Sequence, residues 1–176
     1  MLNSNVEDRW IDCPLEDEDS LNEIQSEWEE ESSVDEFQAE MGLIFSGIAE
    51  DLKRKDISTE YISLVENNTV RAILGLSDAA PGGRVKVLSL YLSPTYWDSP
   101  TCAMLTDLYC AVLIALSDFV MIHARRSIMD SSEVRIYGRD REVLDILRTL
   151  NNNWTPEPPL ELSMIGRWLS VAINRL

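Results

Sequence analysis

The sequence has little of several residue types, and each shortage argues against a class of protein. Its 176 residues include three cysteines and one histidine, too few for a disulfide framework or a Cys/His zinc site, so we expect no metal. Its most apolar run, residues 108–117, is about half of the roughly 20 residues that cross a bilayer. The first residues run into acids rather than forming a signal peptide. We therefore expect a cytoplasmic protein that does not bind a membrane.

Basic residues are also scarce, with 15 Lys and Arg against 31 Asp and Glu and a formal net charge of -16. This balance argues against direct binding to nucleic acid or to anionic membranes, which need a basic surface. The charge is uneven, because residues 1–32 hold 12 acids and one base while residues 33–176 have a net charge of only -5. The sequence thus predicts an acidic N-terminal arm over residues 1–32, followed by one domain over residues 33–176.

The arm is expected to be poorly structured, because its acidic runs repel themselves. Three apolar residues in it, Leu21, Ile24 and Trp28, have the spacing that places side chains on one face of a short helix. Either this helix packs on its own domain, or it is a candidate partner-binding peptide that folds on docking to a protein. In the second case the acids would attract a basic surface. We also expect residues 33–176 to fold without the arm.

Helix and strand patterns alternate through the rest of the chain. Ser33 and Glu36 form a capping box before a helix that ends at residues 53–55. Two strand patterns flank a tight turn at residues 67–68, and a third strand over residues 84–92 is apolar on both faces, which is typical of a central strand. The remaining expected elements are an apolar helix over residues 100–126, a strand over 133–138, a helix capped by Asp140, and a final strand over 161–173 that turns at Gly166-Arg167.

This order of elements resembles the GNAT-type N-acyltransferases over roughly residues 34–174, as does the step from strand 84–92 through Ser93, Pro94 and Tyr96 into a helix. Bacterial proteins without an assigned function share a similar Leu-Ser-Pro turn and an Ile-Tyr-Gly-Arg segment, residues 136–139 here. The resemblance implies an α+β fold with a GNAT-like mixed central sheet and helices on both faces. In that family, the loop after the equivalent strand presents backbone N–H groups to the pyrophosphate of coenzyme A.

The loop departs from the Arg/Gln-x-x-Gly-x-Gly/Ala pattern of that family. Residues 96–103 contain no glycine and no basic residue, Pro100 lacks an N–H, and Asp98 places a carboxylate where phosphate would sit. We therefore expect a non-catalytic binding or regulatory module that uses no cofactor and contacts a protein partner. One alternative is a divergent acyl-CoA-dependent N-acyltransferase that uses acetyl-CoA. Another is an acidic mimic that binds a basic protein surface.

A ligand cleft is predicted at the ends of strands 84–92 and 133–138, where α/β sheets commonly bind ligands. For every candidate residue, ordinary packing or a surface charge is the competing interpretation, and none is assigned a catalytic role. The candidate cleft residues are Ser93, Tyr96, Trp97, Asp98, Ser99, Tyr137 and Arg139.

Overall fold

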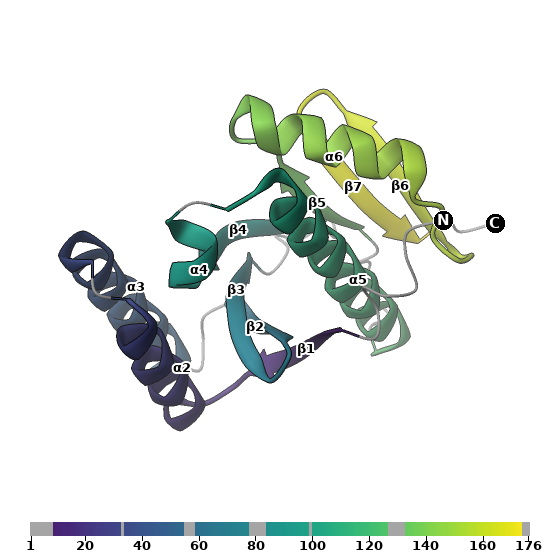
Figure 1. Ribbon diagram of the computed structural model, residues 1–176. Coiled ribbons are helices and arrows are strands. Elements are labelled where there is room, and N and C mark those ends of the chain that lie inside the picture. The colour runs from purple at the N-terminus through teal and green to yellow at the C-terminus, as the bar shows by residue number, and fades with distance from the viewer. Residues whose placement is uncertain are drawn as a thin grey trace.

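A mixed seven-stranded sheet with the strand order β1-β2-β3-β4-β5-β7-β6 forms the centre of the protein (Figure 1). The computed structural model describes residues 9–32, 34–54, 59–77, 84–98, 100–126 and 133–173. Only β4 and β5 pair in parallel, and every other neighbouring pair is antiparallel. The strands are β1 (Trp10–Leu15), β2 (Thr59–Glu66), β3 (Thr69–Ser77), β4 (Arg84–Leu92), β5 (Glu133–Tyr137), β6 (Leu160–Ile165) and β7 (Trp168–Ile173).

Helices cover the two faces of this sheet and enclose two apolar cores. The helices are α2 (Glu18–Glu31), α3 (Asp35–Lys53), α4 (Pro94–Trp97), α5 (Cys102–Arg126) and α6 (Arg141–Asn153). The larger core lies between the sheet and the pair α5 and α6, and the smaller core lies between β1–β4 and the pair α2 and α3. The predicted α+β architecture, with a mixed sheet and helices on both faces, is confirmed.

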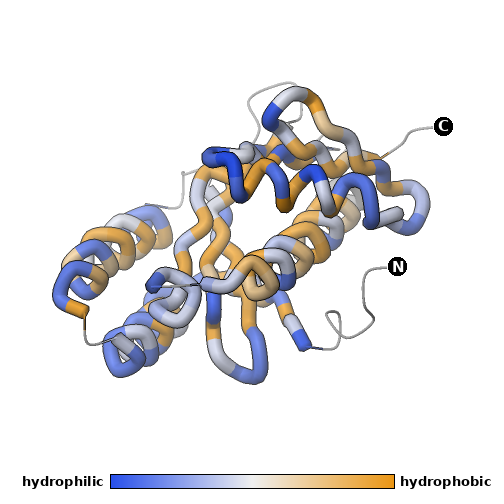
Figure 2. Tube along the Cα trace, turned by 45° about the horizontal axis from the view of Figure 1, so that its top comes forward, coloured by the Kyte–Doolittle hydropathy of each residue, from blue (hydrophilic) through white to orange (hydrophobic). Residues whose placement is uncertain are grey.

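Helix α5 is more apolar than α2, α3 and α6 (Figure 2). By length and composition, the segment Cys102–Ile122 could cross a membrane, with a mean hydropathy of 1.9. However, 56% of this window is buried inside the protein, and α5 supplies much of the larger core. An apolar helix in this position is typical of the centre of a folded domain.

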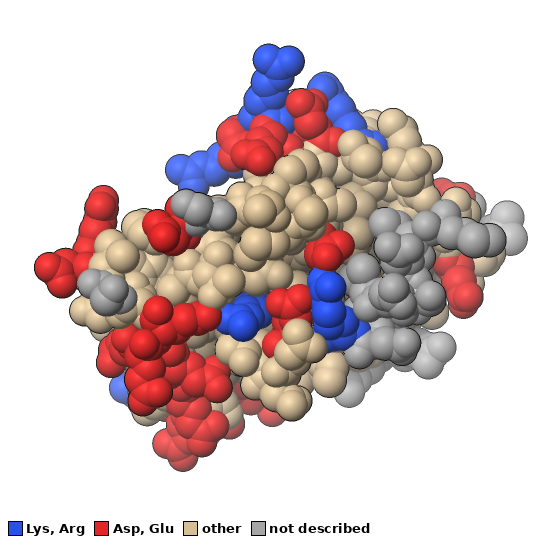
Figure 3. Space-filling view, viewed as in Figure 1, with Lys and Arg blue, Asp and Glu red and all other residues tan. Residues whose placement is uncertain are grey.

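The acidic N-terminal segment is not a separate arm. β1 pairs with β2 along its whole length, and α2 begins at Asp17, whose carboxylate accepts a hydrogen bond from the Ser20 N–H at 2.7 Å. Leu21, Ile24 and Trp28 are only 1%, 6% and 1% exposed in the smaller core. The segment therefore packs on its own domain, and these three side chains are not free to anchor a partner. Burial of the apolar face lets the acids point outward, where they crowd over the α2–α3 end of the molecule (Figure 3).

Ion pairs also tie the N-terminal segment to the sheet. Arg9 lies 2.9 Å from Glu66 of β2 and 2.7 Å from Asp107 of α5. Glu31, at the end of α2, lies 2.7 Å from Arg71 of β3. These contacts connect β1 and α2 to three other elements, which explains why this acidic segment is ordered.

Several local expectations are tested by the element boundaries. The turn at Asn67 and Asn68 is confirmed, with φ angles of 51° and 63° that suit a tight hairpin. The capping box is not seen, because Val34 is the N-cap residue of α3 without a side-chain cap, and Ser33 lies outside the described residues. The predicted last strand is a hairpin of β6 and β7 that turns at Gly166.

Candidate functional site

A cleft opens between β4 and β5, because the two strands pair only through residues 84–86 and 133–135. Farther along, β4 contains an extra residue, Leu88, where its register with β3 shifts between Gly75 and Leu76. Such a bulge bends a strand and increases its twist. Beyond the bulge the two strands are no longer paired, and a cleft of about 630 Å3 lies beside them.

The cleft reaches both faces of the sheet. On one side it is lined by apolar residues of α5, among them Leu105, Leu108 and Val112. On the other side it is lined by Glu40 and Ile44 of α3. A ligand in the cleft could therefore be reached from either layer of helices.

Tyr109 of α5 is a buried hydroxyl in the wall of this cleft. Burial, with a smaller contribution from the charge of Asp140, raises the pKa of Tyr109 to about 12. Its phenol therefore keeps its proton at neutral pH and can donate it to an acceptor in the cleft.

The N-termini of α5 and α6 lie at the carboxyl ends of β4 and β5. The Thr101 hydroxyl accepts from the Met104 N–H at 3.2 Å, and the Asp140 carboxylate accepts from the Val143 N–H at 2.8 Å. A second hollow of about 550 Å3 lies between the first turns of these helices, and Arg141 lines it with a 95% exposed side chain. Two helix N-termini and the Arg141 guanidinium group favour an anion here. The carboxylates of Glu142 and Asp145 line the same hollow and oppose it, and Asp145 lies 3.8 Å from Arg141.

The loop between β5 and α6 is held in place by Arg167 of the β6–β7 turn. Its guanidinium group donates to the carbonyl oxygens of Gly138 and Arg139, both at 2.8 Å, and of Asp140 at 3.3 Å. A Cβ atom at Gly138 would lie 3.1 Å from the Leu144 backbone, so the strand end and α6 approach too closely for a larger residue. These contacts fix the positions of Arg139 and Asp140 in the cleft wall.

Of the seven predicted cleft residues, Tyr137 and Arg139 line the cleft and four others lie elsewhere. Ser93 is 0% exposed, and its N–H donates to the Arg71 carbonyl at 2.9 Å. Asp98 is exposed at the end of α4, and Ser99 lies outside the described residues.

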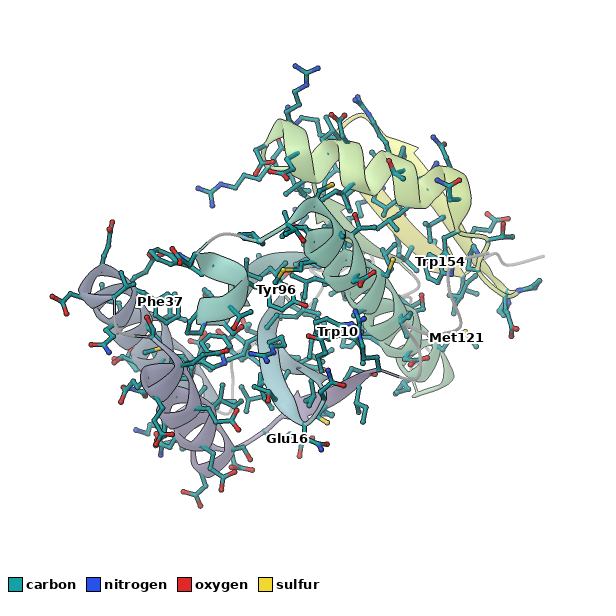
Figure 4. All side chains as sticks on the ribbon, in the orientation of Figure 1. Trp10, Glu16, Phe37, Tyr96, Met121 and Trp154 are labelled. Atoms are coloured by element: carbon teal, nitrogen blue, oxygen red, sulfur yellow. The ribbon has the colours of Figure 1, made fainter. Side chains whose placement is uncertain are left out.

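The remaining two, Tyr96 and Trp97, are turned inward by the short helix α4. The Tyr96 ring packs edge-on against Trp10, with centroids 6.0 Å apart (Figure 4), and its hydroxyl donates to Glu66 at 3.1 Å. Burial raises the pKa of Tyr96. Trp97 packs against Phe37 of α3, with centroids 5.1 Å apart. Both aromatic rings therefore stabilise the fold rather than line the cleft.

Most residues that line the two hollows were not among the candidates, and those with reactive or charged groups include Glu40, Tyr109, Arg141 and Glu142. Arg141 and Glu142 directly follow the predicted cap Asp140, so a search of the first turn of that helix could have found them. Within the described residues, no group of three or more His, Cys, Asp or Glu side chains could hold a metal ion.

No protein-family model and no curated protein sequence matches this chain. A putative acetyltransferase of the GNAT family from Desulfovibrio desulfuricans matches its structure with a TM-score of 0.50 at 8% identity, covering 93% of this chain and 96% of that chain. A possible acetyltransferase from Clostridium difficile matches with a TM-score of 0.49 at 14% identity, covering 89% and 99% of the two chains. At such identities the likeness concerns the fold alone. The chain has a GNAT-like fold, as the order of its elements indicated.

Proposed function

We propose that the chain binds a coenzyme A thioester in the cleft between β4 and β5 and acts as a divergent acyltransferase. The observation that carries the proposal is the separation of these two parallel strands beside the N-termini of α5 and α6. Crevices at the carboxyl ends of parallel strands are common ligand sites. The GNAT-like fold supports the proposal by analogy only, because one fold can host several functions.

The residues of the two hollows fit the two halves of such a ligand. The apolar wall formed by α5 suits an extended acyl and pantetheine chain. The first turn of α5 suits the phosphates, because a helix N-terminus binds anions. Arg139 lines the cleft and Arg141 lines the second hollow, and both can pair with phosphate. The predicted loop lacks basic residues, so these two arginines would have to supply the positive charge, and a bound phosphate would compete with Asp145 for Arg141.

The thioester would supply an activated acyl group, and the chain's own residues would handle protons around it. Tyr109 stays protonated in the cleft and can donate a hydrogen bond to the leaving thiolate. Glu40 lines the cleft from the α3 side, where its carboxylate can accept a proton from an amine. Tyr109 and Glu40 come from opposite layers of helices, so each can contact a different substrate in the cleft.

A second candidate is a binding module without catalysis. It is favoured by the segment after β4, which has no glycine, carries the exposed Asp98, and directs Tyr96 and Trp97 into the core. A carboxylate near the phosphate position opposes anion binding, although Asp98 is free to turn toward solvent. Such a module would bind a ligand without phosphate groups.

Thermal unfolding with 1 mM acetyl-CoA and thiol release with added primary amines separate these functions. Ligand at 100 times its Kd stabilises the folded state by about 2.7 kcal/mol, which raises Tm by several degrees. Arg141→Glu should reduce the shift, whereas Arg148→Glu, a control on α6 outside both hollows, should not. A shift with thiol release supports the acyltransferase, whereas a shift without release shows that the thioester binds and is not transferred. Absence of a shift overturns the acyltransferase and favours the binding module.

A further inference from the structure

Strand β6 forms one edge of the sheet, next to α6 (Figure 1). Among the strands that the structure describes, its one neighbour is β7, so the other side of β6 carries backbone groups without a partner strand. Its register with β7 is regular from Leu160 to Ile165 and contains no bulge, and the strand contains neither proline nor lysine. Folded proteins ordinarily protect an edge strand with these features, so this edge is open to another strand.

The hydrogen bonds of β7 show which residues of β6 face the open side. The Gly138 N–H, just after β5, donates to the Arg167 carbonyl at 2.8 Å, just before β7. Hydrogen bonds alternate in direction along an antiparallel strand, so Trp168 and every second residue after it bond to β6 instead. Because Trp168 is paired with Ile165, the alternate residues of β6 direct their N–H and C=O groups away from β7. These residues are Leu160, Leu162 and Met164.

The side chains of the same three residues form an apolar row that continues to the edge. They lie on the α6 side of the sheet and pack against the larger core, but each is only half-buried. Glu161 and Ser163, between them in the strand, are exposed on the other face. A further strand beside β6 would therefore remove more of this apolar row from water.

The strand is complementary to a second copy of itself. In an antiparallel pair with a two-fold axis at Leu162, that residue lies opposite its own copy and Leu160 lies opposite Met164. The axis thus pairs outward-facing residues only with one another, as hydrogen bonding across the edge requires. On the other face Glu161 lies opposite Ser163, so no two like charges are directly opposed.

The other edge of the sheet is less suited to this contact. β1 contains Pro14, which has no N–H to donate to a further strand. The acids of the chain crowd over the α2–α3 end of the molecule, away from β6 (Figure 3). Two copies joined at β6 keep these acids apart, which lowers the repulsion between chains with a net charge of -16.

We infer that a second copy of the chain docks on β6 and forms a two-fold dimer with one continuous sheet. β7 separates β6 from β5 and the cleft, so this contact does not depend on the proposed function. An edge strand of six residues is about 20 Å long. The dimer should therefore be weak, forming at about 100 μM protein and dissociating at about 1 μM, because its interface is smaller than the standard area of about 800 Å2 per partner.

Sedimentation velocity of the full chain over this concentration range measures the equilibrium. Leu162→Lys places two ammonium groups directly opposite each other at the two-fold axis, so it should raise the Kd of the dimer at least tenfold. Ile11→Lys adds the same charge to an exposed residue on the β1 edge and should leave the Kd within about twofold. Thermal unfolding checks that both variants remain folded.

Disulfide cross-linking tests the pairing even if Leu162→Lys does not fold. The background carries Cys13→Ser and Cys102→Ser, which remove the two exposed cysteines. One protein then carries Glu161→Cys and a second carries Ser163→Cys. In the dimer these two positions form a non-hydrogen-bonded pair with Cα atoms about 4.5 Å apart, which a disulfide can bridge, whereas each lies about 7–8 Å from its own copy. The mixture should therefore form a covalent dimer at least about fivefold faster than either protein alone.

Three outcomes overturn the inference. The first is a chain that remains monomeric at about 100 μM. The second is a Kd that a folded Leu162→Lys leaves unchanged or that Ile11→Lys raises equally. The third is cross-linking that is no faster in the mixture than in the separate proteins. Each of these measurements is made without acetyl-CoA, so failure of the acyltransferase proposal leaves the dimer standing.

Discussion

Trp28 is the side chain by which the acidic segment is most deeply joined to the domain. It is 1% exposed, its ring meets Phe45 edge-on at 5.5 Å, and its indole N–H donates to the Val70 carbonyl at 2.8 Å. Truncating a buried Trp to Ala costs about 3–5 kcal/mol through lost transfer free energy and the cavity that remains. The uncovered Val70 carbonyl adds about 1 kcal/mol. We therefore expect Trp28→Ala to lower the free energy of unfolding by about 4 kcal/mol or more, a large part of the roughly 5–15 kcal/mol that a domain has.

Urea unfolding followed by circular dichroism measures this loss, with Leu43→Ala as the control. Leu43 is 78% exposed on α3, so its truncation should change stability by less than about 0.5 kcal/mol. Trp28→Phe keeps an aromatic ring but removes the hydrogen bond. Its loss in the free energy of unfolding should lie between those of Trp28→Ala and Leu43→Ala. A Trp28→Ala loss no larger than that of Leu43→Ala would refute the reasoning. The sequence led us to expect that residues 33–176 fold alone, but the burial of β1 and α2 in the fold reverses this expectation. Cooperative unfolding of that fragment would therefore refute the reasoning too.

Two further changes probe the site and the charge balance. Gly138→Ala should cost about 1–3 kcal/mol in urea unfolding, because the new Cβ would lie 3.1 Å from the Leu144 backbone, and an unchanged midpoint would show that α6 can move away freely. Desolvation and the charge of Asp12 raise the pKa of Asp118 in the folded protein, so folding carries a small free-energy cost for the ionised side chain. Asp118→Asn should therefore stabilise the protein by about 0.5 kcal/mol at pH 7, and this gain should vanish near pH 3.5, below the unfolded pKa of about 3.9. An equal gain in stability at both pH values would show that the gain does not come from removing the charge of Asp118.

Local patterns in the sequence predicted the element order well, because turn residues and caps act within a few positions of themselves. The Asn67-Asn68 turn and the Asp140 cap of α6 are both where the sequence indicates. The N-terminal segment was predicted less well. Its charge outweighed its apolar residues in the sequence argument, yet in the fold Leu21 and Trp28 meet partners on β3 and α3 that no local pattern could identify.

The site was harder to predict than the fold, because it depends on two features that no local sequence pattern shows. The β4 bulge depends on a register shift opposite Gly75, whose missing Cβ leaves room for Ser89. A sequence shows neither the shift nor the cleft that lies beyond it. The helix α4 then turns Tyr96 and Trp97 into the core, although loop aromatics at a strand end would ordinarily be candidates for a pocket.

The bulge at Leu88 shapes the β4 side of the cleft. The extra residue bends β4 where its pairing with β5 ends, and Leu88 itself remains exposed in the cleft wall. Tyr137, the last residue of β5, also lines the cleft, and the Arg167 guanidinium lies 5.5 Å from the centroid of its ring. Arg167 also donates to the carbonyl oxygens of Gly138 and Arg139, which follow Tyr137. The cleft therefore depends on a register shift in β4 and on a side chain of the β6–β7 turn, and these two features lie far apart in the sequence.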